Sequence, residues 1–263
     1  MTAVSIPDAV YHREGDTLVP TELARGPWSP DAQHGGPPAA LLARAAETFQ
    51  RVDGARVARL TIELLRPVPL VPLRVAARMV RPGRKVQLVE ASLFADDLEV
   101  VRATALRLRE QPLAMPEGIL DPSRPEDGTT GDVAFERDWP VNFADAVEFR
   151  TVRGGPGGEP GPGTCWIRLR VPIVAGEEPT PLQRLAAAAD FGNGISSPLG
   201  WERYTFVNPD LTIALHRAPA GEWIGLESRT WPDADGIGVA DTALYDERGR
   251  VGRSVQTLLL DAR

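Results

Sequence analysis

One stretch of this chain occurs twice, and the repeat constrains the fold more than any other feature. Residues 60–108 match residues 211–259 at a constant offset of 151 positions, without a gap. Leu60-Thr61-Ile62 in the first copy corresponds to Leu211-Thr212-Ile213 in the second. Apolar positions and turn positions of the first copy are mostly apolar and turn positions in the second as well. Two β-rich segments can look alike through composition alone, but here register and turns agree together. The match therefore indicates one structural unit used twice in tandem.

Each copy is predicted to follow a helix and to contain four strands. One helix is predicted at residues 39–52, where small apolar side chains recur at helical spacing. The other is predicted at 181–190, with Thr180 as N-cap, Pro181 as first residue and residues 191–194 ending it. The predicted strands lie at 57–65, 73–80, 86–94 and 100–109, and again at 211–215, 223–231, 238–245 and 251–260. Short turns between them favour an antiparallel meander, so the fold class is α+β.

The domain organisation follows from the repeat and from one change in composition. Residues 111–130 are rich in Pro, Gly and Asp and have little periodicity, which is typical of a linker. We therefore predict an N-terminal domain at 1–110, a linker at 111–130 and a C-terminal domain at 131–263. A length of 263 residues suits two domains that each bury a core.

Composition excludes several classes of function. The net charge of −7 and pI of about 5.1 argue against nucleic acid as a partner, although a local basic patch can still bind a small anion. Cys165 is the only cysteine, which leaves no disulfide framework and no thiolate metal site. The N-terminus lacks the regions of a signal peptide, and no apolar run is long enough for a membrane span. We expect a cytoplasmic protein.

Common catalytic motifs are missing as well. The chain has no G-x-S-x-G nucleophile elbow, no dinucleotide fingerprint and no phosphate-binding loop. Its three histidines, His12, His34 and His216, are too far apart in sequence to suggest a metal motif. We expect neither a metal nor a redox cofactor.

Asp190 is the first candidate for chemistry. It ends a predicted helix whose preceding positions are mostly alanine and leucine. A carboxylate there faces the negative end of the helix dipole, which disfavours ionisation and is expected to raise its pKa toward a value useful for a general base. The alternative is a solvated Asp, or one that bonds Asn193 or the glycine turn.

Gln256 and Thr230 are candidates because the repeat differs there. Gln256 stands where the first copy has Ala105, and Thr230 where it has Met79. A polar residue in one copy only suggests that one half carries a site, and an amide can hold a water or a carbonyl. The alternatives are an exposed strand Gln and an ordinary strand Thr, with Ser228 and Arg229 competing for the same role.

His34-Gly35-Gly36, ahead of the first helix, is the remaining candidate. Free backbone amides at a helix start can polarise a carbonyl. The alternative is that the glycines only make the turn and His34 packs in the core. His216 and Arg217 can reach an anionic ligand, or can equally be a strand end at the surface.

These residues resemble a known family. The order of His34-Gly35-Gly36-Pro37-Pro38, Leu65-Arg66-Pro67, Trp166-Ile167-Arg168, residues 181–190, residues 210–217 and Ser254-Val255-Gln256 is similar to the double hotdog fold of the acyl-CoA thioesterase II family. The resemblance covers most of the chain and is thin across 111–145. It implies two helix-plus-antiparallel-sheet units in tandem that form one continuous sheet.

The resemblance also implies roles for the candidate residues. Asp190 would be the general base that activates a water against the thioester carbonyl, with Gln256 and Thr230 positioning that water. Amides of Gly35 or Gly36, beside His34, would bind the substrate oxygen. The substrate would be an acyl-CoA, and a homodimer is expected.

Two alternatives remain open. The chain departs from the family pattern at Pro37 and at Arg229, so a non-catalytic acyl-CoA-binding protein is the first. A hotdog enoyl-CoA hydratase or dehydratase is the second, and it would require a His–Asp or His–Glu arrangement that the sequence pattern does not show.

Overall fold

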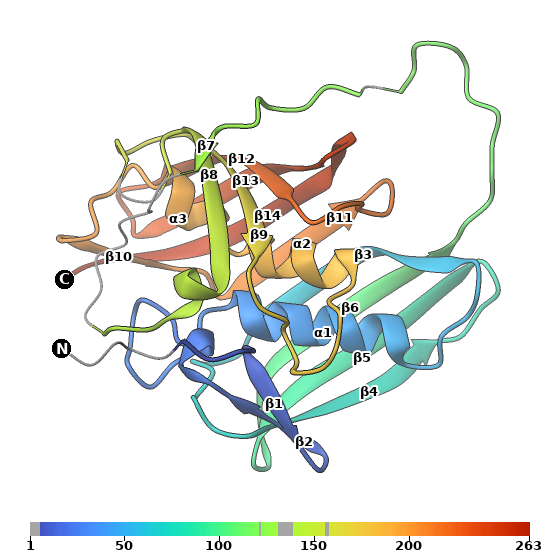
Figure 1. Cartoon of the computed structure of the whole chain (residues 1–263), viewed down its shortest axis with the longest axis horizontal. Coiled ribbons are helices and arrows are strands. Elements are labelled where there is room, and N and C mark those ends of the chain that lie inside the picture. The colour runs from blue at the N-terminus through green and yellow to red at the C-terminus, as the bar shows by residue number, and fades with distance from the viewer. Residues whose placement is uncertain (1–5, 121, 131–138, 156–157) are drawn as a thin grey trace.

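The computed structural model of the protein describes residues 6–120, 122–130, 139–155 and 158–263. Their strands form a single antiparallel sheet, and the helices α1, α2 and α3 lie against its inner face (Figure 1). The order across the sheet is β1-β2-β4-β5-β6-β3-β11-β14-β13-β12-β9-β8-β7, with β10 also paired to β14. The strands of the N-terminal half are β1 Tyr11–Glu14, β2 Thr17–Pro20, β3 Ala55–Leu64, β4 Leu73–Arg81, β5 Val86–Ala95 and β6 Leu98–Arg109. Those that follow are β7 Thr129–Thr130, β8 Val147–Arg153, β9 Gly163–Leu169, β10 Tyr204–Val207, β11 Asp210–Leu215, β12 Ile224–Pro232, β13 Ile237–Asp246 and β14 Gly249–Ala262.

The two halves join where β3 pairs with β11. Thr61 lies directly opposite Thr212, and their hydroxyl oxygens are 3.5 Å apart. These two threonines occupy the same position in the two copies of the repeat, so a pseudo-twofold axis passes between them. The register inside each half also repeats, since Val89 faces Ala105 as Ala240 faces Gln256. The predicted α+β fold, with two units in one continuous sheet, is confirmed.

The predicted four-strand meander is wrong in one respect. Only β4, β5 and β6 form a meander, because β3 pairs with β6 and with β11 instead of with β4. The C-terminal half repeats this, with β11 beside β14. The pairing gives both central strands a neighbour on each side, which removes two edges with unpaired N–H and C=O groups.

The helices begin and end close to the predicted residues. Helix α1 spans Gly36–Thr48 and α2 spans Pro181–Ala189; two short 3-10 helices lie at Glu22–Ala24 and Phe143–Ala146. The predicted cap of α2 is confirmed: the Thr180 hydroxyl accepts from the N–H of Gln183, whose side chain accepts from the N–H of Thr180. Helix α2 ends just before residues 191–194, as predicted, but these residues are not a simple turn, because a further short helix, α3, spans Gly192–Ser196. The Gln256 side chain accepts from the N–H of Asn193 and so satisfies the first turn of α3.

Helices α1 and α2 pack closely through alanine-rich faces. At the closest point, a Cβ added to Gly36 would lie 2.6 Å from the carbonyl oxygen of Ala187 and 2.7 Å from the ring of Phe143. Only a hydrogen fits there. The contact holds the start of α1 against the end of α2, and the two helices come from different halves of the chain.

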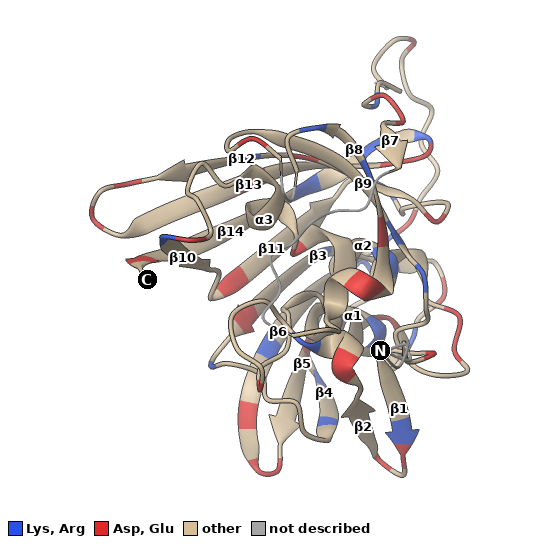
Figure 2. Cartoon of the chain, turned by 60° about the vertical axis from the view of Figure 1, so that its left-hand side comes forward, with Lys and Arg blue, Asp and Glu red and all other residues tan. Residues whose placement is uncertain are grey.

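Charged side chains lie mostly on the outward side of the strands and in loops (Figure 2). Within the described ranges, Arg107, Asp190 and Asp246 are the charged residues that are buried. Arg107 donates to the carbonyls of Ala46 and Phe49 near the end of α1, and Asp246 is paired with Arg217. Asp190 is the third, and its partners come from both halves. No helix in the described residues is long and apolar enough to cross a membrane.

The close contact at Gly36 predicts that an added methyl group there destabilises the fold. We expect Gly36→Ala to lower the free energy of unfolding by about 1–3 kcal/mol, because the methyl group forces the two helices apart. Gly200→Ala is the matched control, since a Cβ at Gly200 has no neighbour within 4 Å. Urea denaturation of both variants makes the comparison. Equal stability of the two variants would contradict the close-packing argument.

Candidate active site

Asp190 is the C-cap of α2, and its carboxylate points at the first turn of α1. Its side chain is 4% exposed. Oδ2 lies 2.8 Å from Nδ1 of His34, and the backbone N–H of Gly36 donates to that Nδ1 at 3.0 Å while also facing the carboxylate. Oδ1 accepts from the Asn208 amide at 2.8 Å and from the Gln256 amide at 3.3 Å. Two halves of the chain therefore supply one hydrogen-bonded cluster.

The two glycines let the backbone approach this carboxylate. A Cβ on Gly35 would lie 2.7 and 2.8 Å from the two Asp190 oxygens. Pro37 and Pro38 have no N–H, so the first turn of α1 offers only the N–H groups of Gly35 and Gly36. The Gly36 N–H is shared between His34 Nδ1 and Asp190, whereas the Gly35 N–H has no acceptor among the described residues. The Gly35 N–H is thus available to a ligand.

The pKa of Asp190 is lowered, which is opposite to the shift expected from the sequence. Burial raises the pKa, but the charge of His34 and the hydrogen bonds from His34, Asn208 and Gly36 together outweigh it. The negative end of α2, taken alone, would raise the pKa of Asp190. The carboxylate in fact lies at the positive end of α1, which favours the ionised form.

Gln256 links this cluster to the sheet. It lies on β14 with 1% of its side chain exposed, so the alternative of an exposed strand glutamine is wrong. Its amide nitrogen also lies 3.2 Å from the backbone oxygen of Asp190, and its amide oxygen accepts from the N–H of Asn193 at 3.0 Å. Both ends of the amide are used, which fixes its orientation.

Thr230 does not reach the cluster. Thr230 and Gln256 lie on the same face of the sheet, and Ala240 lies between them on the intervening strand. The backbones of Thr230 and Gln256 are therefore two strand spacings, or roughly 9–10 Å, apart. The Thr230 hydroxyl is bonded to Ser196 at 2.8 Å. Asn208, which sequence reasoning missed, supplies the third side chain at Asp190. The available signal was a polar residue in the short Asn208-Pro209 connection between β10 and β11.

At the centre of the sheet's inner face, four positions are polar in the C-terminal half and alanine in the N-terminal half. Ser228 and Thr242 are bonded at 2.7 Å, and Ser254 lies opposite Thr242. The equivalent positions in the first copy, 151 residues earlier, are Ala77, Ala91 and Ala103, and Ala105 stands for Gln256. This asymmetry places the polar side chains around Gln256 in the C-terminal half although the fold is duplicated.

A cavity of about 620 Å³ opens beside the cluster, lined by His34, Gly35, Asp190 and Asn208. The rest of its lining is mostly apolar and includes Trp28, Pro67, Val68, Val207, Pro209 and Leu259. Trp28 is supported by Trp201, with ring centroids 4.7 Å apart. Arg66 is the one Lys or Arg side chain in this lining, and it is exposed. Such a cavity suits an apolar group that ends at a polar one.

His216 and Arg217 lie away from this cavity. Arg217 pairs with Asp246, and burial together with the charge of Arg217 lowers the pKa of His216. Among the described residues, no group of three His, Cys, Asp or Glu side chains is arranged to hold a metal ion.

The lowered pKa of Asp190 predicts a pH dependence of stability. A carboxylate with a depressed pKa stabilises the fold above its unfolded pKa of about 3.9, and this contribution is lost as the pH falls through the folded pKa. We expect Asp190→Asn to be less stable than wild type by about 1–3 kcal/mol at pH 7, and the gap to narrow below about pH 4. Urea unfolding across pH 3–7 measures this, with exposed Asp53→Asn as control. A gap that widens toward acid would contradict the assignment.

The comparisons with known proteins agree with the repeat. The chain matches the family model of the acyl-CoA thioesterase N-terminal domain over residues 24–108 and that of the C-terminal domain over residues 121–260. A comparison with curated protein sequences found no match.

Solved structures share the fold over nearly the whole chain. A candidate thioesterase II from Thermobifida fusca has a TM-score of 0.72 at 20% identity, and the match covers 97% of this chain and 96% of the Thermobifida chain. A hot dog protein of unknown function from Alicyclobacillus acidocaldarius has a TM-score of 0.71 at 17% identity, with 97% of both chains covered. The acyl-CoA thioesterase II TesB2 from Mycobacterium marinum has a TM-score of 0.63 at 15% identity, with 88% and 90% covered. With both of its domains matched in order, this chain belongs to the acyl-CoA thioesterase family of tandem hotdog proteins.

Proposed function

We propose that the chain hydrolyses an acyl-CoA thioester in the cavity beside Asp190. The observation that carries the proposal is the buried carboxylate of Asp190, bonded to His34 and Asn208 at the end of an apolar cavity. The acyl group lies along the apolar lining, and Arg66 at the same cavity offers a cation to the phosphates of CoA. Family membership supports an acyl-CoA substrate.

The thioester carbonyl is held at the start of α1. The Gly35 N–H is the free donor there, and the positive end of the helix favours the negative charge that develops on the carbonyl oxygen. Pro37 and Pro38 leave no other amide to share this role. The oxyanion site therefore depends on a single backbone donor and the helix dipole.

The hydrogen bonds at Asp190 favour a base other than its own carboxylate. Three side-chain donors, from His34, Asn208 and Gln256, already occupy the two oxygens of the carboxylate and leave it poorly placed to take a proton from water. His34 offers a better acceptor in the tautomer whose Nδ1–H donates to Asp190, because its Nε2 then carries a free lone pair and has no hydrogen-bond partner among the described residues. In this tautomer the N–H of Gly36 bonds the carboxylate instead of Nδ1. Asp190 then orients His34, and Nε2 takes the proton of the attacking water. Hydroxide adds to the carbonyl, and the sulfur of CoA leaves with a proton returned from His34.

Thiol release tests this proposal. We expect wild type to release thiol from one or more members of a panel of short, long and aromatic acyl-CoAs, and Asp190→Asn to be slower by about 10²–10⁴. His34→Gln separates the two possible bases, because the amide can still donate to Asp190 but cannot accept a proton. An equally large loss supports His34 as the base, and retained activity would assign that role to Asp190 directly.

The same panel addresses the alternatives. Tight acyl-CoA binding without thiol release from any substrate would overturn hydrolysis and favour a binding protein. The pair of His34 and Asp190 at 2.8 Å corrects the expectation that the chain lacks a His–Asp arrangement. It supports water addition to an enoyl thioester as a second candidate. Loss of enoyl absorbance without thiol release would identify that reaction.

Substitutions of Asn208 and Thr230 are expected to affect thiol release differently. We expect Asn208→Ala to slow thiol release by about 10-fold or more, because Asp190 loses a charge-assisted hydrogen bond of about 1.5–3 kcal/mol. Thr230→Val removes only the bond to Ser196, so its kcat is expected to stay within about threefold of wild type. Steady-state kinetics of both variants, with circular dichroism to verify folding, gives the answer. A larger loss at Thr230 would restore it to the site.

A further inference from the structure

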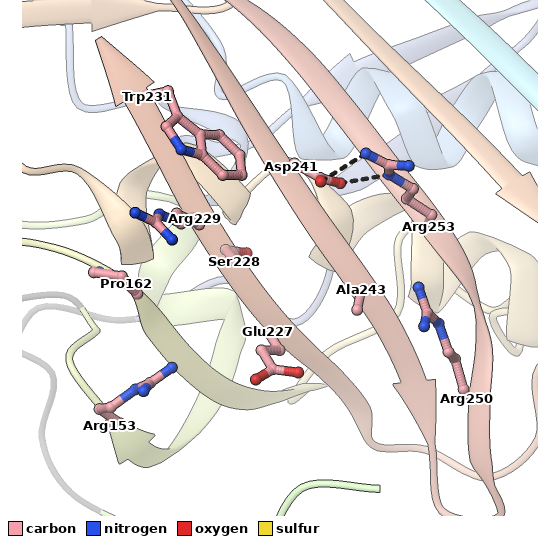
Figure 3. A pocket seen from close by; sticks show the side chains of 10 residues that line it. All are labelled: Arg153, Pro162, Glu227, Ser228, Arg229, Trp231, Asp241, Ala243, Arg250 and Arg253. Atoms are coloured by element: carbon pink, nitrogen blue, oxygen red, sulfur yellow. Dashed lines mark hydrogen bonds and ion pairs between the residues drawn. The ribbon is translucent and has the colours of Figure 1, made fainter. Parts of the chain in front are cut away.

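The outer face of the C-terminal half contains a second hollow, of about 450 Å³, which shares no lining residue with the cavity beside Asp190 (Figure 3). Along β12, Glu227, Arg229 and Trp231 are exposed on this face, whereas Ser228 and Thr230 are buried toward the helices. The sheet therefore separates the hollow from the proposed catalytic cluster.

The hollow carries an excess of positive charge. Its charged lining consists of Arg153, Arg229, Arg250 and Arg253 against Glu227 and Asp241. The two carboxylates are already engaged, since Arg253 binds both oxygens of Asp241 at 2.5 and 2.6 Å and the Tyr245 hydroxyl donates to Glu227 at 3.2 Å. Within the described ranges, Arg153, Arg229 and Arg250 have no carboxylate partner.

The first copy of the repeat provides an internal comparison for this face. The residues 151 positions before Arg229, Asp241, Arg250 and Arg253 are Arg78, Glu90, Glu99 and Arg102. There the charges balance, because Arg78 is bonded to Glu90 at 2.7 Å and Arg102 to Glu99 at 2.9 Å. The second copy has Arg250 where the first has Glu99. This reversal of charge leaves guanidinium groups unpaired around the hollow.

Unpaired guanidiniums around a hollow of this size suit a phosphorylated small molecule. Guanidinium groups bind phosphate oxygens in pairs of parallel hydrogen bonds. A volume of about 450 Å³ falls in the range of about 300–1,000 Å³ typical of small-molecule sites. Trp231, 47% exposed, adds an aromatic ring at one end of the hollow, with the Arg229 guanidinium 5.1 Å from its centroid. We propose that the hollow binds an organic diphosphate, with a nucleoside diphosphate as the simplest ligand.

Calorimetric titration with ADP tests the proposal on the full chain. Wild type is expected to bind ADP with saturation, and Arg250→Glu, which copies the first half, to weaken binding by about tenfold or more. Arg59→Glu is the matched control, because it makes the same charge change at an exposed position on β3. Its affinity for ADP is expected to stay within about twofold of wild type.

Further titrations distinguish free nucleotides from CoA as the ligand, and some of their results would contradict the proposed diphosphate site. Free nucleotides and CoA carry the same diphosphate, so titration of CoA into Asp190→Asn, with and without Arg250→Glu, shows whether the hollow accepts CoA as well. No saturable ADP binding at millimolar concentration would overturn the proposal. So would equal losses in Arg250→Glu and Arg59→Glu, or displacement of ADP by an equal concentration of sulfate. Because these titrations measure binding without turnover, they are independent of thiol release.

Discussion

The carboxylate of Asp190 is buried at the point where the two helices meet, and a buried charge persists only where donors replace the water it has lost. The first turn of α1, His34, Asn208 and Gln256 supply these donors. The arrangement requires the glycines at positions 35 and 36, because a side chain at either would overlap with the carboxylate or with α2. The close crossing of the helices and the continuous sheet below them hold this cluster in place. The cavity opens beside it.

The duplication explains why the cluster can form inside one chain. Its donors on α1 come from the first half, whereas Asp190 and Gln256 come from the second, and the pairing of β3 with β11 fixes the halves relative to each other. Across the pseudo-twofold axis, alanines occupy the positions of Ser228, Thr242, Ser254 and Gln256. The fold is thus nearly symmetric, while its polar interior is not. The same comparison on the outer face shows a balanced set of charges in one half and unpaired arginines in the other.

Charge interactions at the cluster also bear on the choice of base. Burial alone would raise the pKa of Asp190, but the charge of His34 and the hydrogen bonds from His34, Asn208 and Gly36 lower it. Because its two oxygens are already bonded by His34, Asn208 and Gln256, the carboxylate is better suited to orient His34 than to accept a proton itself. This is the physical reason for assigning Asp190 a positioning part and His34 the proton transfer in the proposed hydrolysis.

The sequence by itself determined the repeat, its offset, most of the strands and the cap of α2, and it singled out Asp190, Gln256 and the His34-Gly35-Gly36 segment, which the fold brings together. These follow from periodicity and from local rules for helix ends, which depend on neighbours along the chain. Only the tertiary structure decided that β3 leaves the meander, that Asn208 and not Thr230 bonds Asp190, and that the pKa of Asp190 falls. Each depends on groups far apart in sequence: a strand from the other half, a connection eighteen residues from Asp190 and the N-terminus of a helix more than a hundred residues away. Local pattern carries no information about such distances, so the sign of an electrostatic shift and the partner of a buried carboxylate had to come from the fold.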